Sequence, residues 1–246
     1  MNMDTKRKSD FLSSAVNTRI NQGLRAYLLR VYRFMGLGLL VSALTAYLGS
    51  TPTFLGFLSK ISPSGTASTI WSWSVIIIPF ILVFKFSSAI NKFNAAKAQT
   101  IFWIFSALMG FSLSRIFIMF TSASLFQAFI ITAGAFGGLC LYGHTTKKDL
   151  TGLGIFMGMG LWGIIIAVIV NIFLGSPAIA YGISIITVLV FSGLTAYDSQ
   201  HIEKIYNPTD SLEASQSKAI AGALALYLDF INLFLGILRL IGESNK

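Results

Sequence analysis

Two aspartates near the end of the chain stand inside long apolar stretches, where a charged group has chemical consequences. Asp229 is the only charged residue between Ala219 and Leu238. Asp198 lies about nine residues before the Asn207–Pro208 pair, which should stop a helix. An acid at membrane depth costs several kcal/mol, so intramembrane acids are usually functional. These two residues are therefore the first candidates for a functional site.

The two acids are expected to meet each other. On adjacent antiparallel helices, Asp198 and Asp229 would lie roughly 13 and 15 Å from the same membrane surface, at about 1.5 Å of rise per residue. Two carboxyl groups in hydrogen-bonding contact in a low dielectric cannot readily both ionise, so they would share one proton. Such a pair would be a proton-sensitive latch that attracts cations once it is deprotonated. The alternative is that each acid separately binds a backbone group or a lysine and only fixes the packing.

Small and polar residues accompany both acids along their helices. Ser184, Thr187 and Thr195 share a helical face with Asp198. Small residues allow close helix approach, so this face and the matching one of the last helix should pack within a bundle and away from lipid. The residues of that matching face recur at steps of three and four: Gly222, Ala225, Asp229, Asn232 and Gly236.

The elements that must position these residues are apolar segments. The 246 residues are 54% hydrophobic and 11% charged, with a mean hydropathy of +0.74, which is typical of a polytopic helical membrane protein. We therefore predict an all-α integral membrane protein with a polar tail at 1–27 and a single seven-helix transmembrane domain at 28–246. Seven segments are long enough to span a bilayer: Val31–Leu48, Trp71–Ala89, Ala98–Phe120, Leu125–Gly143, Leu150–Leu174, Ala178–Tyr206 and Ala219–Gly242.

Lysine and arginine are divided unevenly between the two predicted sides. With the N-terminus inside, most of the 18 basic residues fall on the inner side, and Lys60, Arg115, Arg239 and Lys246 fall outside. This asymmetry favours a cytoplasmic N-terminal tail and an outer C-terminus. The net charge of +9 is then explained by membrane orientation, and no nucleic-acid partner is expected.

The sequence around the acids resembles a known family. The motifs YDSQHI at 197–202 and LYLDFINLFLGILRLIG at 226–242 are similar to those of the bacterial branch of the Bax inhibitor-1 (transmembrane Bax-inhibitor-motif) family, as are GFSLS at 110–114, TKKDL at 146–150 and NIF at 171–173. The resemblance implies a bundle in the bacterial inner membrane whose last helix is central and surrounded by the other six. It also implies a pH-sensitive calcium leak with Asp198 and Asp229 as the sensing pair, which would hold calcium only weakly.

Several further residues are candidates for supporting that pair. Family members with a described latch hold the first acid with an arginine near the end of the second helix, where this chain offers Lys85 and Lys92. Lys85 is the candidate latch, although it lacks the planar fork of arginine. By contrast, His144 near Lys147 is interpreted as part of an ordinary cytoplasmic loop. The remaining candidates lie close to the acids in sequence: Asn232, Tyr197, Tyr227 and His201.

Enzymatic function is not expected. The chain has two histidines and one cysteine, and it lacks HExxH and GxSxG patterns. Intramembrane aspartyl proteases place their second acid in GxGD, whereas Asp229 lies in YLDF. The expected function is thus a calcium leak without a cofactor, whose partners are the lipid bilayer, calcium ions and protons. The alternative is a non-conducting membrane regulatory protein that modulates a membrane protease or a stress-response partner.

Overall fold

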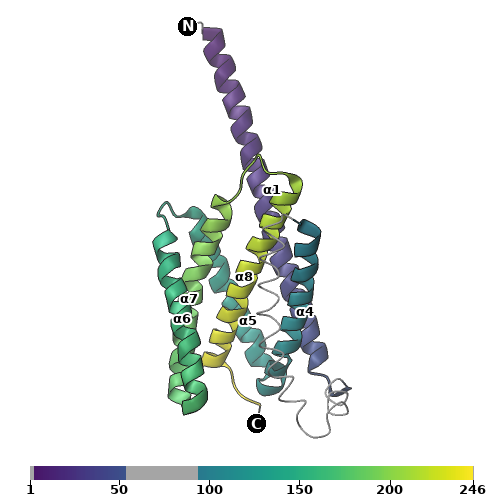
Figure 1. Ribbon diagram of the computed structural model, residues 1–246, viewed down its shortest axis with the longest axis vertical. Helices are drawn as coiled ribbons and strands as arrows, with labels where there is room; N and C mark the ends of the chain where they lie inside the picture. Colours follow the sequence, from purple (N-terminus) through teal and green to yellow (C-terminus); the bar gives the residue numbers. More distant parts are fainter. Residues whose placement is uncertain (1–2, 54–93, 246) are drawn as a thin grey trace.

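The computed structural model describes residues 3–53 and 94–245, and these residues form an all-helical bundle (Figure 1). Residues 3–20 are described by their backbone alone. No strand is found within these ranges, where a single antiparallel bridge joins Phe120 to Ser244. The helices are α1 (Met3–Gly49), α4 (Ala95–Met119), α5 (Ser122–Thr145), α6 (Thr151–Leu174), α7 (Pro177–Lys204) and α8 (Leu212–Ile241).

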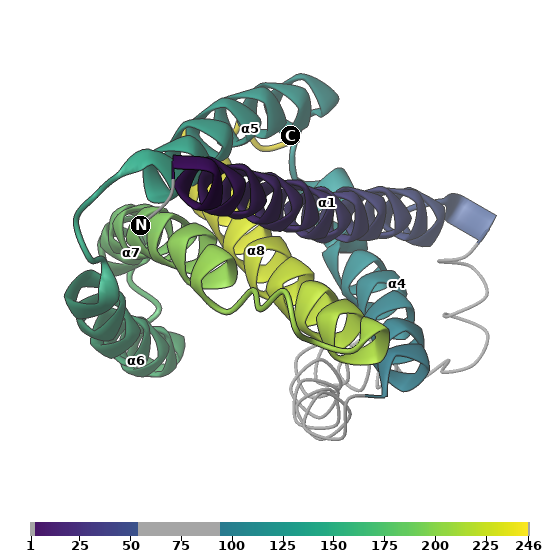
Figure 2. The ribbon, with the colours of Figure 1, turned by 90° about the horizontal axis from the view of Figure 1, so that it is seen from above.

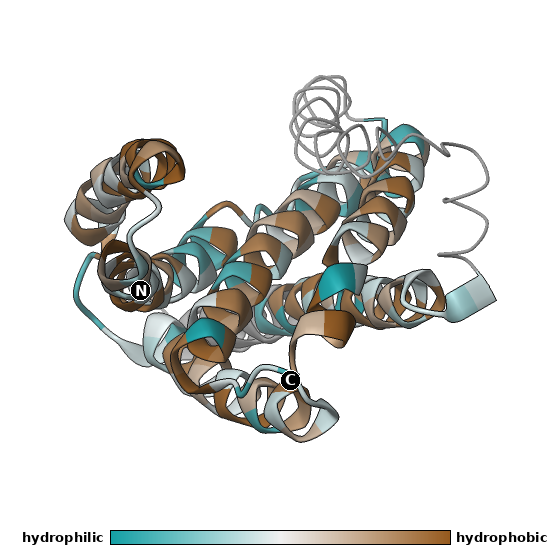
Figure 3. Cartoon of the chain, turned by 90° about the horizontal axis from the view of Figure 1, so that it is seen from below, coloured by the Kyte–Doolittle hydropathy of each residue, from teal (hydrophilic) through white to brown (hydrophobic). Residues whose placement is uncertain are grey.

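Six described helices are long and apolar enough to cross a membrane, which confirms six of the predicted apolar segments. Figure 3 shows hydrophobic residues along all of them. The predicted second segment, Trp71–Ala89, lies outside the described residues, as does Lys85. The count of seven helices and the orientation in the membrane therefore stay predictions.

The first helix begins much earlier than the predicted span. A polar tail was expected through residue 27 and an apolar span from Val31, but α1 runs unbroken from Met3 to Gly49. Its apolar part begins at Asn21, and its first turns project beyond the other helices (Figure 1). The reason is that no proline occurs before Pro52, and lysine and arginine are good helix formers. Hydropathy marks where a chain enters the bilayer, not where its helix starts.

Helices α1 and α4 pack closely and run parallel. Gly38 of α1 lies against Phe102 of α4, and further along both helices Gly110 of α4 lies against Ser42. A Cβ atom on Gly110 would lie 2.2 Å from the Ser42 carbonyl oxygen, so glycine is needed for this approach. Because the two helices are parallel, the end of α1 and the start of α4 lie at opposite ends of the bundle.

Helix α8 is the most buried of the described spans. In its most apolar window 67% of the residues are buried, compared with 6% for α6. It packs against α1, α4, α5 and α7 (Figure 2). This finding supports a central last helix, but it corrects the expectation that every other helix surrounds it, because the main contact of α6 is with α7. Large side chains of α6 such as Trp162 and Phe173 are exposed, as suits a lipid-facing helix.

A short turn connects α7 to α8 and fixes the depth of the residues on both. Helix α7 ends at Lys204, shortly before the predicted stop at Pro208. Helix α8 is capped by Ser211, whose hydroxyl oxygen accepts a hydrogen bond from the backbone N–H of Ala214. The two helices are consequently antiparallel neighbours that start from one end of the bundle, which we call the turn end.

Candidate functional site

Asp198 of α7 and Asp229 of α8 lie within hydrogen-bonding reach of each other across the interface of the two helices. Asp229 is only 4% exposed, and Asp198 is partly buried. The second carboxyl oxygen of Asp229, Oδ2, has no hydrogen-bond partner among the described residues. A hydrogen bond between two carboxyl groups requires a proton on one of them. The structure thus brings together the two acids that the sequence placed at similar depths.

Glycines on α8 allow the two acids to approach. Gly222 and Gly236 stand seven residues before and after Asp229, and both face α7. A Cβ atom on Gly222 would lie 2.9 Å from Ile202, and one on Gly236 would lie 2.9 Å from Val188. The small and polar face predicted for α8 is therefore the surface that packs on α7, as small residues at helix interfaces permit.

The hydroxyl groups beside the acids are bonded within their own helix. Ser184 donates to the Ala180 carbonyl, and Thr195 donates to the Phe191 carbonyl at 2.7 Å. Both residues are buried. Their polar atoms therefore find partners four residues back in α7, which leaves the carboxyl groups to interact with each other.

Two of the expected supporting residues on α8 have other hydrogen-bond partners. The Asn232 amide donates to the Leu228 carbonyl at 2.8 Å, within its own helix. The Tyr227 hydroxyl lies 2.7 Å from the Ser42 hydroxyl of α1, and its ring packs edge-on against Phe105 of α4. The contacts of Tyr227 correct the expectation that it supports the acids, because Tyr227 has the right depth but faces α1 and α4. Asn232 shares the helix face of Asp229, but its amide nitrogen is bonded within α8.

Tyr197 and His201 also lie away from the acids. Their rings stack with centroids 5.6 Å apart, and the Tyr197 ring covers Gly154 of α6. His201 is exposed. Successive residues of a helix are rotated by about 100°, so Tyr197 faces α6 while Asp198 faces α8. This placement corrects the expectation that Tyr197 and His201 tune the pair.

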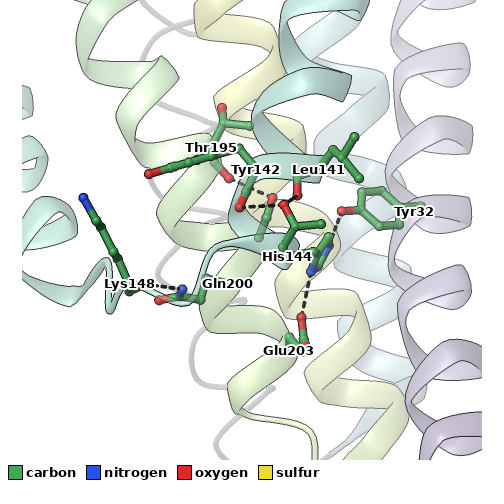
Figure 4. Close-up of polar contacts among 10 residues, drawn as sticks. Tyr32, Leu141, Tyr142, His144, Lys148, Thr195, Gln200 and Glu203 are labelled. Atoms are coloured by element: carbon green, nitrogen blue, oxygen red, sulfur yellow. Dashed lines mark hydrogen bonds and ion pairs between the residues drawn. The ribbon is translucent and has the colours of Figure 1, made fainter.

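His144 is a functional candidate that the sequence analysis missed. It was interpreted as part of a loop, but it lies in the last turn of α5 between two other helices. Its Nε2 atom is 2.7 Å from the Tyr32 hydroxyl of α1, and its Nδ1 atom is 3.0 Å from Oε2 of Glu203 on α7 (Figure 4). The signal available in the sequence was that a histidine and a glutamate lie at similar depths near the ends of two predicted helices.

Gln200 holds the loop between α5 and α6 against α7. Its side-chain oxygen accepts a hydrogen bond from the Leu150 backbone N–H at 2.9 Å, and its amide nitrogen donates to the Lys148 carbonyl at 2.8 Å (Figure 4). Lys204 donates to the exposed Asp149 carboxylate at 2.6 Å. This hydrogen bond lowers the pKa of Asp149 to about 2.

These side chains surround a polar pocket of about 500 Å³ at the turn end. In the described part of the chain, no group of three or more His, Cys, Asp or Glu residues could hold a metal ion. Calcium takes six to eight oxygen ligands, which is more than two carboxyl groups alone supply. The pocket is lined by Leu24, Gly143, His144, Thr146, Lys147, Lys148, Asp149, Gln200, Glu203 and Lys204.

Comparison with known proteins finds a matching family and several similar bacterial proteins. The family described as "Inhibitor of apoptosis-promoting Bax1" matches residues 24–246. The inner membrane protein YbhL of Escherichia coli strain K12 is 40% identical over 226 residues, covering 90% of this chain and 93% of YbhL. A protein of Borreliella burgdorferi is 43% identical over 222 residues, covering 89% and 93% of the two chains. Protein RP147 of Rickettsia prowazekii is 36% identical over 231 residues, covering 94% and 95%.

Proposed function

The chain belongs to the Bax inhibitor-1 family, and from this premise we propose that it is a pH-sensitive calcium leak of the bacterial inner membrane. The gate is the pair formed by Asp198 and Asp229. The observation that carries the proposal is the contact between these two carboxyl groups inside the most buried part of the bundle. The inner membrane location follows from the similarity to YbhL, an inner membrane protein of Escherichia coli.

The gate works through one shared proton. While the proton lies between the carboxyl groups, the hydrogen bond holds α7 against α8. When the proton leaves, two negative charges face each other, and at an effective dielectric constant of about 20 two charges 4 Å apart repel by about 4 kcal/mol. This repulsion separates the helices and at the same time creates a site that attracts a divalent cation. Calcium flux is therefore expected to rise as the pH rises through the titration of the pair.

Flux measurements on the purified full-length chain in liposomes test this proposal. The wild type should pass calcium with a pronounced pH dependence, and Asp229→Asn and Asp198→Asn should each flatten it, because the substituted pair no longer changes charge in the same way. Glu213→Gln is the matched control, since it removes an exposed acid from the first turn of α8 without touching the pair. An unchanged pH profile in both aspartate variants would contradict the gate.

A second candidate function is a non-conducting regulatory protein that acts on a membrane protease or a stress-response partner. The observation that favours it is the start of α1, which projects from the bundle as a continuous helix (Figure 1). Such a protein would show no calcium flux at any pH. Deleting residues 1–20 would abolish co-purification of the partner, whereas a leak with its gate in α7 and α8 would keep its flux.

A further inference from the structure

We propose that Tyr32, His144 and Glu203 form the route by which protons travel between the polar pocket at the turn end and the acid pair. This inference rests on the proposed function, because it assigns the path that supplies the gate with its proton. Three different helices contribute to the route: Tyr32 comes from α1, His144 from α5 and Glu203 from α7.

The imidazole of His144 is placed to act as a relay. Both of its ring nitrogens have partners, with the Tyr32 hydroxyl at 2.7 Å on one side and the Glu203 carboxylate at 3.0 Å on the other. A neutral imidazole can accept a proton on one nitrogen and release one from the other. The ring therefore links a group that faces the pocket to a group that faces the interior.

The route continues inward from Tyr32. The Ser199 side chain packs against Gly143, which precedes His144 on α5, and the Ser199 hydroxyl donates to the Thr195 carbonyl at 2.8 Å. Ser199 is fully buried and follows Asp198 directly on α7. Cys140 is buried one helical turn before His144 on α5. A buried hydroxyl and a buried thiol therefore lie beside the inner end of the route, and the hydroxyl belongs to the residue next to Asp198.

The outer end of the route meets solvent. The side chain of Glu203 is 38% exposed and that of His144 is 20% exposed, and both residues line the polar pocket. Water in the pocket can therefore exchange protons with Glu203. The titratable and charged groups around His144 are Tyr32 from α1, Cys140 from its own helix, Glu203 and Lys204 from α7, and Lys147, Lys148 and Asp149 from the adjoining loop.

The transfer balances at every group. For inward movement, a proton on Glu203 passes to Nδ1 of His144, and the proton on Nε2 passes to the Tyr32 oxygen. Tyr32 hands its own hydroxyl proton to Ser199 or Cys140, which in turn releases one proton to a carboxylate of the pair; for Ser199 this step requires its hydroxyl to turn away from the Thr195 carbonyl, to which it donates. Each intermediate group accepts one proton and gives one up, so the net change is one proton moved from the pocket to the pair.

Infrared difference spectra of the full-length chain in liposomes test the route by following the carboxyl band of the pair after a pH jump. Tyr32→Phe removes only the hydroxyl, so it should slow proton uptake by about tenfold or more and leave the midpoint of the titration unchanged. Glu203→Gln should slow uptake as well. The matched control is Tyr27→Phe on the same helix, because Tyr27 is buried and its hydroxyl has no partner among the described residues.

The outcomes separate this route from the gate itself. Slow uptake in Tyr32→Phe and Glu203→Gln, with the wild-type rate in Tyr27→Phe, supports the route. Uptake at the wild-type rate in both route variants would overturn it while leaving the gate intact. In the wild type, the gate requires a carboxyl band that Asp229→Asn removes. If the wild-type spectrum has no such band, the gate is overturned, and the route with it.

Discussion

The hydroxyl groups of Tyr227 on α8 and Ser42 on α1 lie 2.7 Å apart in the interior of the bundle. Ser42 in turn donates to the Ser106 carbonyl of α4 at 2.7 Å. One buried contact thus joins the central helix to the parallel α1–α4 pair. The acid pair lies on the other side of α8, which faces α7. The interface of α8 with α1 therefore contains a contact between hydroxyl groups, whereas its interface with α7 contains the carboxyl pair.

Tyr227→Phe tests that separation. Loss of one buried hydrogen bond should lower the free energy of unfolding by about 0.5–1.5 kcal/mol, because Ser42 keeps its bond to the Ser106 carbonyl. The pH profile of calcium flux should not change, since the Tyr227 hydroxyl does not contact the acids. Denaturant titration in detergent gives the first quantity and liposome flux the second. A shifted pH profile would show that the two faces of α8 are coupled.

Gly110→Ala tests the close approach of α1 and α4. The added methyl group would lie 1.9 Å from the Thr45 hydroxyl oxygen and 2.2 Å from the Ser42 carbonyl oxygen, and the carbonyl is backbone and cannot rotate away. Overpacking of this kind costs about 1–3 kcal/mol. The thermal midpoint in detergent should therefore fall.

The control for Gly110→Ala is Gly138→Ala on α5. A Cβ atom at Gly138 meets nothing within 4 Å in the described residues. Replacing a helical glycine by alanine in open space favours the helix by about 0.5–1 kcal/mol. Equal effects of the two substitutions on the thermal midpoint would contradict the tight α1–α4 packing.

Asp149 and Lys204 give a prediction about pH outside the membrane spans. The hydrogen bond from Lys204 lowers the pKa of Asp149 from 3.8 to about 2. A lowered pKa stabilises the folded state above the unfolded value, and this contribution is lost as the pH falls from 3.8 toward 2. Asp149 therefore stays ionised between about pH 5 and 8, and Asp149→Asn should leave the pH dependence of flux over that range unchanged. A flux midpoint that moves in Asp149→Asn would place part of the pH sensor in this loop.

The depth of the acid pair could be predicted from the sequence, but most of its surroundings could not. Counting residues from the turn between α7 and α8 placed Asp198 and Asp229 opposite each other, because the rise of a helix is constant. The direction of Tyr197, by contrast, depends on which helix packs on each side of α7. Asn232 was assigned to the pair because its amide needs a partner, but the Leu228 carbonyl of its own helix provides one.

The contacts of His144 could not be predicted from the sequence, for a related reason. Tyr32 and His144 are separated by 112 residues, and His144 and Glu203 by 59. Such contacts arise only from the way in which α1, α5 and α7 converge at the turn end. Periodicity within one helix carries no information about that convergence.

The unbroken length of α1 also has a mechanical consequence. At about 1.5 Å per residue, its 47 residues make a rod of about 70 Å that contains no proline to bend it. If gating tilts this rod by about 5°, its far tip swings by about 6 Å. A spin label near the start of α1 would therefore magnify a movement that is too small to measure beside the acids.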